Sequence, residues 1–141
     1  MDNFYMTLDE RHALVESYLG KTVTVGIDRP IGYIHNKGTK TLVYPINYGY
    51  IPGVLGGDGE ELDVFLLGVD RPVEGYTGRI IGIAYRADDI EDKLIMAPEG
   101  TVYTAEEIAR AILFQEKYYH TTVRSIDGSV SDIPSLLVKN Q

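Results

Sequence analysis

The segment that decides the fold reads Gly57-Asp58-Gly59-Glu60-Glu61-Leu62-Asp63-Val64-Phe65. A glycine-rich acidic turn is followed at once by an apolar run that reaches position 67. A short apolar run bounded by turn residues is typical of a central β-strand. Asp63 begins this run, and a carboxylate that enters a central strand is costly unless a partner such as a metal ion compensates its charge. The segment therefore predicts a β-rich core with an acidic site beside it.

Further strands are predicted on both sides of this segment. Residues 21–28 alternate, with Val23, Val25 and Ile27 on one side, as expected of a half-buried strand. The other predicted strands are residues 41–44, 79–86 and 93–97, while residues 47–53 have the composition of a turn. Short, evenly spaced strands are typical of a barrel or sandwich, and a closed barrel protects its strand edges. We expect one mainly β domain over residues 1–141, a small closed OB-like β-barrel with flanking helices.

Two capping boxes predict the helices. Thr7 with Glu10 begins the first helix, which Gly20 can end, and Thr104 with Glu107 begins the second, which runs to about Tyr119. The residues that follow, with the apolar triplet at 136–138, are expected to dock as a tail.

The composition excludes several classes of function. The chain has 141 residues, no Cys and a net charge of −8. Disulfides, zinc–thiolate sites and thiol nucleophiles are excluded, and the charge repels nucleic acids and anionic membrane surfaces. The start lacks the pattern of a signal peptide and no apolar stretch is long enough to span a membrane, so we expect a soluble, cytoplasmic protein. An acidic protein can still bind an anionic small molecule where metal ions reverse the local charge.

A second acidic cluster lies between two predicted strands and reads Asp88-Asp89-Ile90-Glu91-Asp92-Lys93. Each acidic loop taken alone is typical of a solvated turn. A barrel could instead bring both loops to one mouth, where their carboxylates would bind two or more metal ions. Such ions activate a water molecule and neutralise phosphate charge together.

These segments resemble the soluble, metal-dependent inorganic pyrophosphatases of the single-domain barrel type. The family's acidic hexad, Asp-x-Asp-x-x-Asp, corresponds to residues 58–63. Residues 44–51, Tyr-Pro-Ile-Asn-Tyr-Gly-Tyr-Ile, are similar to a second family segment, and Asp88 to Leu94 resembles its second acidic loop and lysine. The helix that ends at residues 114–119 is similar to the family's C-terminal helix. The resemblance runs from about Val23 to Tyr119.

The resemblance implies a set of site residues. The implied metal ligands are Asp58, Asp63, Asp88 and Asp92. The implied phosphate-binding residues are Lys93, Tyr118, Tyr44 and Lys37, and the implied catalytic residues are Glu60, Lys93 and Tyr48. Glu60 takes the place of the family's water-activating Asp. The resemblance also implies Mg²⁺ as cofactor, with Mn²⁺ as an alternative, and a homo-oligomer.

The chain departs from the family pattern at several of these positions. Glu60 replaces an Asp, and the second acidic loop is shortened. The family's first strand carries a phosphate-binding Lys and a Glu, whose positions here correspond to Thr24 and Gly26. The positions implied to bind metal agree with the family pattern better than the positions implied to bind phosphate. The predicted N-terminal helix has no counterpart in that pattern.

The sequence leaves several functions open. The favoured one is metal-dependent hydrolysis of inorganic pyrophosphate to two phosphates. The alternatives are hydrolysis of another phosphoanhydride, such as a nucleotide polyphosphate, and a relative that binds metal or phosphate without turnover. A barrel that binds nucleic acid is disfavoured by the net charge and by the lack of a basic stripe.

Overall fold

The computed structural model describes residues 6–133 and is built mainly of β-strands with two helices. The helices are α1 (Leu8–Tyr18) and α2 (Ala105–Glu116). The strands are β1 (Thr22–Arg29), β2 (Ile34–Lys37), β3 (Lys40–Val43), β4 (Asn47–Leu55), β5 (Glu61–Leu66), β6 (Gly75–Arg86), β7 (Lys93–Ala97), β8 (Thr121–Ser125) and β9 (Val130–Asp132).

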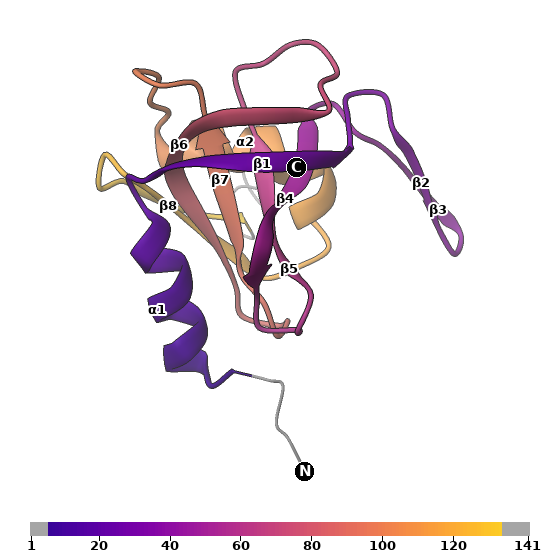
Figure 1. Cartoon of the computed structure of the whole chain (residues 1–141). Coiled ribbons are helices and arrows are strands. Elements are labelled where there is room, and N and C mark those ends of the chain that lie inside the picture. The colour runs from indigo at the N-terminus through magenta and orange to yellow at the C-terminus, as the bar shows by residue number, and fades with distance from the viewer. Residues whose placement is uncertain (1–5, 134–141) are drawn as a thin grey trace.

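Five strands close into a barrel, in the order β1-β4-β5-β7-β6, because β1 pairs with both β4 and β6. All of these pairings are antiparallel except the parallel pair of β5 and β7. Strands β8 and β9 extend the sheet beyond β6, and the β2–β3 hairpin forms a separate sheet that projects to one side (Figure 1). The expected closed barrel with flanking helices is confirmed.

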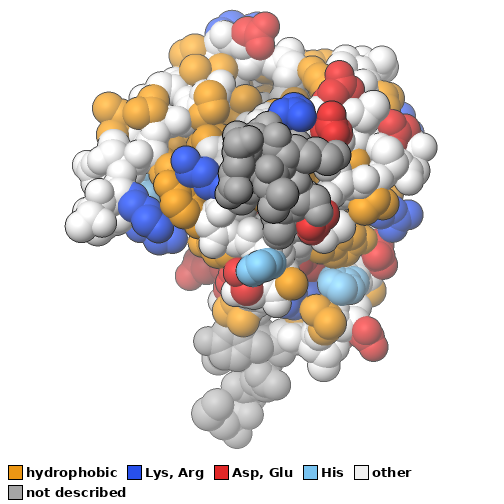
Figure 2. All heavy atoms as spheres, turned by 180° about the vertical axis from the view of Figure 1, so that it is seen from behind, with side chains coloured by type: hydrophobic (Ala, Val, Ile, Leu, Met, Phe, Trp, Pro, Cys, Tyr) orange, Lys and Arg blue, Asp and Glu red, His pale blue; other side chains and the backbone are white. Residues whose placement is uncertain are grey.

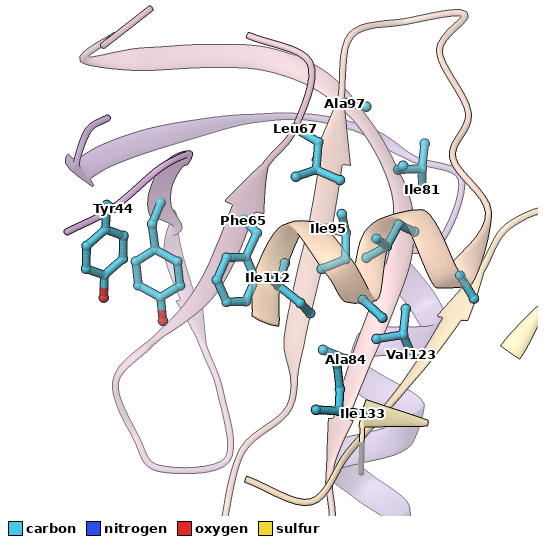
Figure 3. Packing of buried hydrophobic residues seen from close by; sticks show 14 residues of the cluster. Tyr44, Phe65, Leu67, Ile81, Ala84, Ile95, Ala97, Ile112, Val123 and Ile133 are labelled. Carbon is cyan, nitrogen blue, oxygen red and sulfur yellow. The ribbon is translucent and has the colours of Figure 1, made fainter. Parts of the chain in front are cut away.

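Alternation along the central strands divides the buried side chains between two clusters. Phe65 and Ile95 belong to the cluster beneath α2, which lies across the strands in Figure 3. Val64 and Leu94 belong to a second cluster, which Val15 of α1 joins. Successive strand residues point to opposite faces of a sheet, so β5 and β7 are buried on both sides.

Both predicted helix starts are confirmed. The Thr7 and Thr104 side chains accept hydrogen bonds from the backbone N–H groups of Glu10 and Glu107, whose carboxylates in turn accept from the two cap residues. The chain leaves α1 through Gly20, whose φ of 90° suits glycine. No helix among residues 6–133 is both long and apolar enough to cross a membrane.

The prediction of a turn at residues 47–53 is wrong, because these residues lie in β4. A Cβ atom on Gly49 would lie 1.8 Å from the carbonyl oxygen of Gly26, so glycine permits the close approach of β1 and β4. Gly53, with a φ of 79°, lies where the register of β4 with β5 shifts. The turn-forming residues here serve close packing and a bulge instead of a chain reversal.

The C-terminal prediction is wrong in part. The residues after α2 form β8 and β9, two strands that the sequence did not predict, and the predicted docking of residues 134–141 lies outside the described residues. The β2–β3 hairpin extends the single strand predicted at residues 41–44, with Lys37 opposite Lys40 beside its tip.

Gly49→Ala is expected to reduce the free energy of unfolding by about 1–3 kcal/mol, the usual cost of overpacking. The added methyl group would meet backbone atoms of β1, which cannot move aside as a flexible side chain can. Urea denaturation would measure the loss. Gly75→Ala is the matched control, because its nearest obstacle, the Val25 carbonyl oxygen, lies 3.1 Å from the new Cβ. Equal stability of Gly49→Ala and the native chain would contradict this account.

Candidate active site

A pocket of about 480 Å³ opens between the barrel, the β2–β3 hairpin and the end of α2. Its lining residues include Arg29, His35, Lys37, Lys40, Tyr44, Tyr48, Asp63, Arg86, Lys93, Gln115, Tyr118 and Tyr119. Figure 2 shows Lys and Arg side chains gathered on the side of the molecule where the hairpin lies. We call this hollow the basic pocket.

The charge of the basic pocket is opposite to that of the whole chain. Among residues 6–133, five Lys and Arg side chains line the pocket, and Asp63 supplies the single carboxylate of its lining. The chain as a whole has a net charge of −8. A cleft lined by charges of one sign concentrates ligands of the opposite sign, so the basic pocket is suited to a small anion.

Lys93 lies at the floor of the basic pocket, where β7 begins. Its ammonium donates to Asp63 Oδ2 at 2.5 Å and to Glu91 Oε1. The Tyr48 hydroxyl donates to the same Asp63 oxygen at 2.9 Å. Burial pushes the pKa of Lys93 down, but the negative charges of Asp63 and Glu91 beside it help to hold that pKa above its ordinary value. Burial raises the pKa of Tyr48, so it stays a neutral donor.

Arg29, at the end of β1, supplies a second cation. Its Nη1 donates to the Tyr44 hydroxyl at 2.6 Å, and this hydroxyl donates to Gln115 Oε1 at 2.8 Å. The guanidinium lies 5.7 Å from the ring centre of Tyr48, and the Lys93 ammonium also lies 5.7 Å from that centre. Sequence reasoning missed Arg29, because no motif marks it.

The outer wall of the basic pocket pairs cations with tyrosine rings. The Lys40 ammonium lies 4.0 Å from the centre of the Tyr118 ring, and the Arg86 guanidinium lies 3.8 Å from that of Tyr119. Lys37 Nζ donates to the Tyr119 hydroxyl at 3.5 Å. All four predicted phosphate-binding residues thus line one pocket, together with cations that the sequence had not identified.

Asp58 and Glu91 bring the two acidic loops together. Burial raises the pKa of Glu91 to about 8, and a hydrogen bond to Asp58 raises it as well. The pKa of Asp58 is lowered, because bonds from Glu91 and from the Glu60 backbone N–H outweigh its burial. When both carboxylates are ionised, the buried Glu91 Oε2 has no hydrogen-bond partner within residues 6–133. A buried carboxylate oxygen beside a second carboxylate is suited to a cation.

Asp92 lies on the other side of this loop. Its Oδ1 accepts from Arg11 Nη2 at 2.7 Å and from the Arg86 backbone N–H at 3.0 Å, so its carboxylate faces α1. Asp92 thus contacts Arg11 and the end of β6, and its role as a metal ligand stays a prediction. Glu91, which the sequence did not predict as a site residue, contacts Lys93 and lies beside Asp58.

Asp88, the remaining predicted ligand, is exposed on the same loop. Its Oδ1 accepts from the backbone N–H of His120 at 2.9 Å, which ties the loop to the start of β8. The structure therefore engages Asp88 in a backbone contact away from the Lys93 floor.

Glu60 lies on a second, shallower hollow of about 350 Å³. The hollow is lined by Asp28, Tyr50, Glu60, Glu61 and Asp63. Asp63 lines both hollows, so Glu60 is on the acidic side of this carboxylate and Lys93 is on its basic side. Burial raises the pKa of Asp28, and the charges of Asp63 and Glu61 raise it further.

Residues 6–133 contain no group of three or more Asp, Glu, His or Cys side chains that could hold a metal ion. Mg²⁺ usually keeps several waters and binds through one or two carboxylates together with substrate phosphates. The Asp58–Glu91 pair offers two such carboxylates, and Glu91 Oε2 has no hydrogen-bond partner in the part of the chain that the structure describes. The donor chemistry of this pair therefore fits a hard divalent cation.

The sequence comparisons agree on one protein family. A family model described as inorganic pyrophosphatase matches residues 13–122. An inorganic pyrophosphatase of Neisseria meningitidis serogroup B is 33% identical over 88 residues, which cover 53% of this chain and 48% of the relative. One of Campylobacter jejuni is 24% identical over 130 residues, which cover 82% and 75%. The match thus spans about half the length of the Neisseria relative.

Solved structures agree on the fold. An inorganic pyrophosphatase from Coxiella burnetii has a TM-score of 0.56 at 18% identity, with coverage of 84% of this chain and 90% of that one. A structure of one from Neisseria gonorrhoeae has a TM-score of 0.52 at 24% identity, with coverage of 70% and 74%. These likenesses concern the barrel and its helices.

Proposed function

Because the chain belongs to the inorganic pyrophosphatase family, we propose that it hydrolyses inorganic pyrophosphate to two phosphates in a reaction that depends on Mg²⁺. The main support for the proposal is the position of Lys93. Lys93 lies at the floor of the basic pocket and also contacts the carboxylates of Asp63 and Glu91, so the site has room for an anion and a divalent cation side by side.

In this proposal the phosphoryl groups lie in the basic pocket. Lys93 and Arg29 neutralise their charge at the floor, and Lys37 does so from the hairpin. Tyr44, Tyr48 and Tyr118 orient the anion through neutral hydroxyl groups. Preorganised cations and donors in a pocket with little water stabilise a charged transition state more strongly than water does.

The cation is held by Asp58 and Glu91 with help from Asp63. When bound, a divalent ion supplies an acidified water and neutralises charge on the phosphoryl oxygens. A cation held there would compete with the proton that burial favours on Glu91, whose pKa is raised to about 8. Mn²⁺ is an alternative to Mg²⁺, because Mg²⁺ requires the stricter octahedral geometry.

Glu60 is proposed as the base that takes a proton from the attacking water. It shares the shallow hollow with Asp63, and the Asp58 carboxylate accepts a hydrogen bond of 2.9 Å from its backbone N–H. Its side chain is exposed and can therefore turn toward a water between the two hollows.

Glu60→Gln is expected to lower the rate of phosphate release from pyrophosphate by about 10²-fold or more, because an amide cannot accept the proton. Glu60→Asp is expected to keep or raise the rate. Steady-state assays with Mg²⁺ and with Mn²⁺ would measure both variants.

Glu99→Gln is the control, because Glu99 is an exposed acid bonded to Thr22 and lines neither hollow. Equal rates for the native chain and Glu60→Gln would remove Glu60 from the base role. Binding of metal by all variants without any turnover would favour a non-catalytic relative.

The proposal as a whole is tested by phosphate release from pyrophosphate with and without Mg²⁺ or Mn²⁺. A panel of nucleoside polyphosphates in the same assay tests the alternative substrate class. Turnover of the nucleotides without turnover of pyrophosphate would replace the proposed substrate.

The remaining expectations concern the whole protein. We propose that residues 1–141 act as one domain, that the protein works in the cytoplasm and that it forms a homo-oligomer. The single closed barrel supports the first of these, and family membership supports the third. Light scattering of the purified chain would test self-association.

A further inference from the structure

Arg11 is a charged residue on the buried side of α1. It is 8% exposed, and it lies one helical turn before Val15, which joins the core. A buried arginine is expected only where partners satisfy its guanidinium. Within residues 6–133, the partners of its two Nη atoms all belong to one short loop, residues 87–92, and to Arg86, the β6 residue that precedes it, while its Nε has no hydrogen-bond partner.

The guanidinium bridges the two ends of this loop. Nη2 donates to the Arg86 carbonyl oxygen at 3.0 Å and to Asp92 Oδ1 at 2.7 Å, and Nη1 donates to the Asp89 carbonyl oxygen at 2.8 Å. Asp92 Oδ1 also accepts from the Arg86 backbone N–H at 3.0 Å. Arg11 and Asp92 therefore fix where the chain leaves β6 and where it enters β7.

The same arginine lies close to the other acidic loop. A Cβ atom on Gly57 would lie 3.1 Å from Arg11 Cγ and 2.0 Å from the Ile90 carbonyl oxygen. The backbone next to Asp58 is thus packed against both the arginine stem and the loop that carries Glu91. Arg11 is therefore bonded to the loop that carries Glu91 and, together with the Ile90 carbonyl oxygen, leaves no room for a side chain at Gly57, next to Asp58.

We propose that Arg11 and Asp92 are positioning residues, through which α1 holds the Glu91 loop against the Asp58 turn in the geometry that binds a divalent cation. The proposal rests on the proposed function for its cation. Neither side chain needs to touch the cation or the substrate, because both act through Glu91 and Asp58. Removal of such supporting groups typically lowers metal affinity about 10–100-fold.

The experiment must separate positioning from stability. Arg11→Met leaves Asp92 buried without its partner, so this variant will also lose stability. The double variant Arg11→Met, Asp92→Leu removes both charges and is expected to regain most of that stability. It cannot restore the bonds to the Arg86 and Asp89 carbonyl oxygens. Arg110→Met is the control, because Arg110 pairs with Glu106 on the exposed side of α2.

Calorimetry with Mn²⁺ alone, urea denaturation and amide hydrogen exchange should be applied to all four proteins. We expect the double variant to bind Mn²⁺ about 10–100-fold more weakly than the native chain. Amides of residues 87–92 should exchange faster, while amides of β5 and β7 stay protected. Arg110→Met should match the native chain throughout.

The outcomes distinguish this proposal from the proposed function. Native Mn²⁺ affinity in a stable double variant would overturn the positioning role, and so would unchanged exchange in residues 87–92. If the native chain binds no Mn²⁺ and releases no phosphate, the proposed function fails. In that case, faster amide exchange confined to residues 87–92 and the Asp58 turn would still support the positioning role of Arg11 and Asp92. An equal increase in amide exchange across the whole protein would overturn that role.

Discussion

Lys93→Met is expected to lower the rate of pyrophosphate hydrolysis by about 10²–10³-fold, the usual loss when one preorganised donor to a transition state is removed. Methionine keeps the unbranched stem but has no charge. Lys93 is 5% exposed at the floor of the basic pocket, so water cannot easily replace its ammonium. The loss should appear mainly in kcat, because this cation would act most strongly on charge that develops during the reaction.

Lys21→Met is the matched control. Lys21 is exposed, lies 5.2 Å from the Tyr18 ring centre and is outside the basic pocket. Its loss should leave the rate unchanged. A Lys93→Met protein that remains folded and hydrolyses pyrophosphate at the native rate would show that the phosphoryl groups bind elsewhere. Circular dichroism should accompany the assay, because Asp63 and Glu91 lose their cation in this variant.

Arg86→Met is expected to reduce the free energy of unfolding by about 3–5 kcal/mol, the usual cost of breaking a buried ion pair from one side. Arg86 Nε donates to Glu116 Oε1 at 2.9 Å and Nη2 donates to Oε2 at 2.5 Å. The Glu116 side chain is 0% exposed. Thr121 remains as a donor to it, but a neutral hydroxyl cannot compensate a full buried charge. Urea denaturation measures the loss.

Two further proteins give this prediction its controls. Arg86→Met combined with Glu116→Gln should recover much of the stability, because no buried charge is left unpaired. Arg110→Met, which removes an exposed pair with Glu106, should change stability by less than about 1 kcal/mol. If the single and the double Arg86 variants were equally unstable, the cost would lie in lost packing and not in the Glu116 charge.

Much of the fold could be predicted because local signals agreed with the tertiary structure. The capping boxes begin both helices where expected, and apolar runs mark β5 and β7, which are buried on both faces. β4 escaped prediction because Gly49 and Pro52 are typical of turns. Only the contact of Gly49 with β1, which is remote in sequence, explains why glycine stands in that strand.

The site could be predicted where residues belong to motifs. Asp63, Lys93 and Tyr48 meet at one point, although their separate positions in the sequence show no such contact. The sequence predicted Asp92 as a ligand, whereas the carboxylate that lies beside Lys93 and Asp58 belongs to Glu91, one residue earlier. Glu91 contacts Lys93, two positions along, whereas Asp92 faces α1, as alternation along an extended chain would give. That periodicity was the signal that could have identified Glu91.

The pairing of β1 with β6, which closes the barrel, affects the rate at which this protein folds. It joins Thr22 to Arg79, so much of the chain must be ordered before the barrel can close. The parallel pairing of Val64 with Leu94, beside Asp63 and Lys93, is also non-local. Such high contact order places folding in the slow range, roughly milliseconds to seconds. Affinity for the anion should therefore arise late on the folding pathway, so a bound anion would slow unfolding more than it accelerates folding.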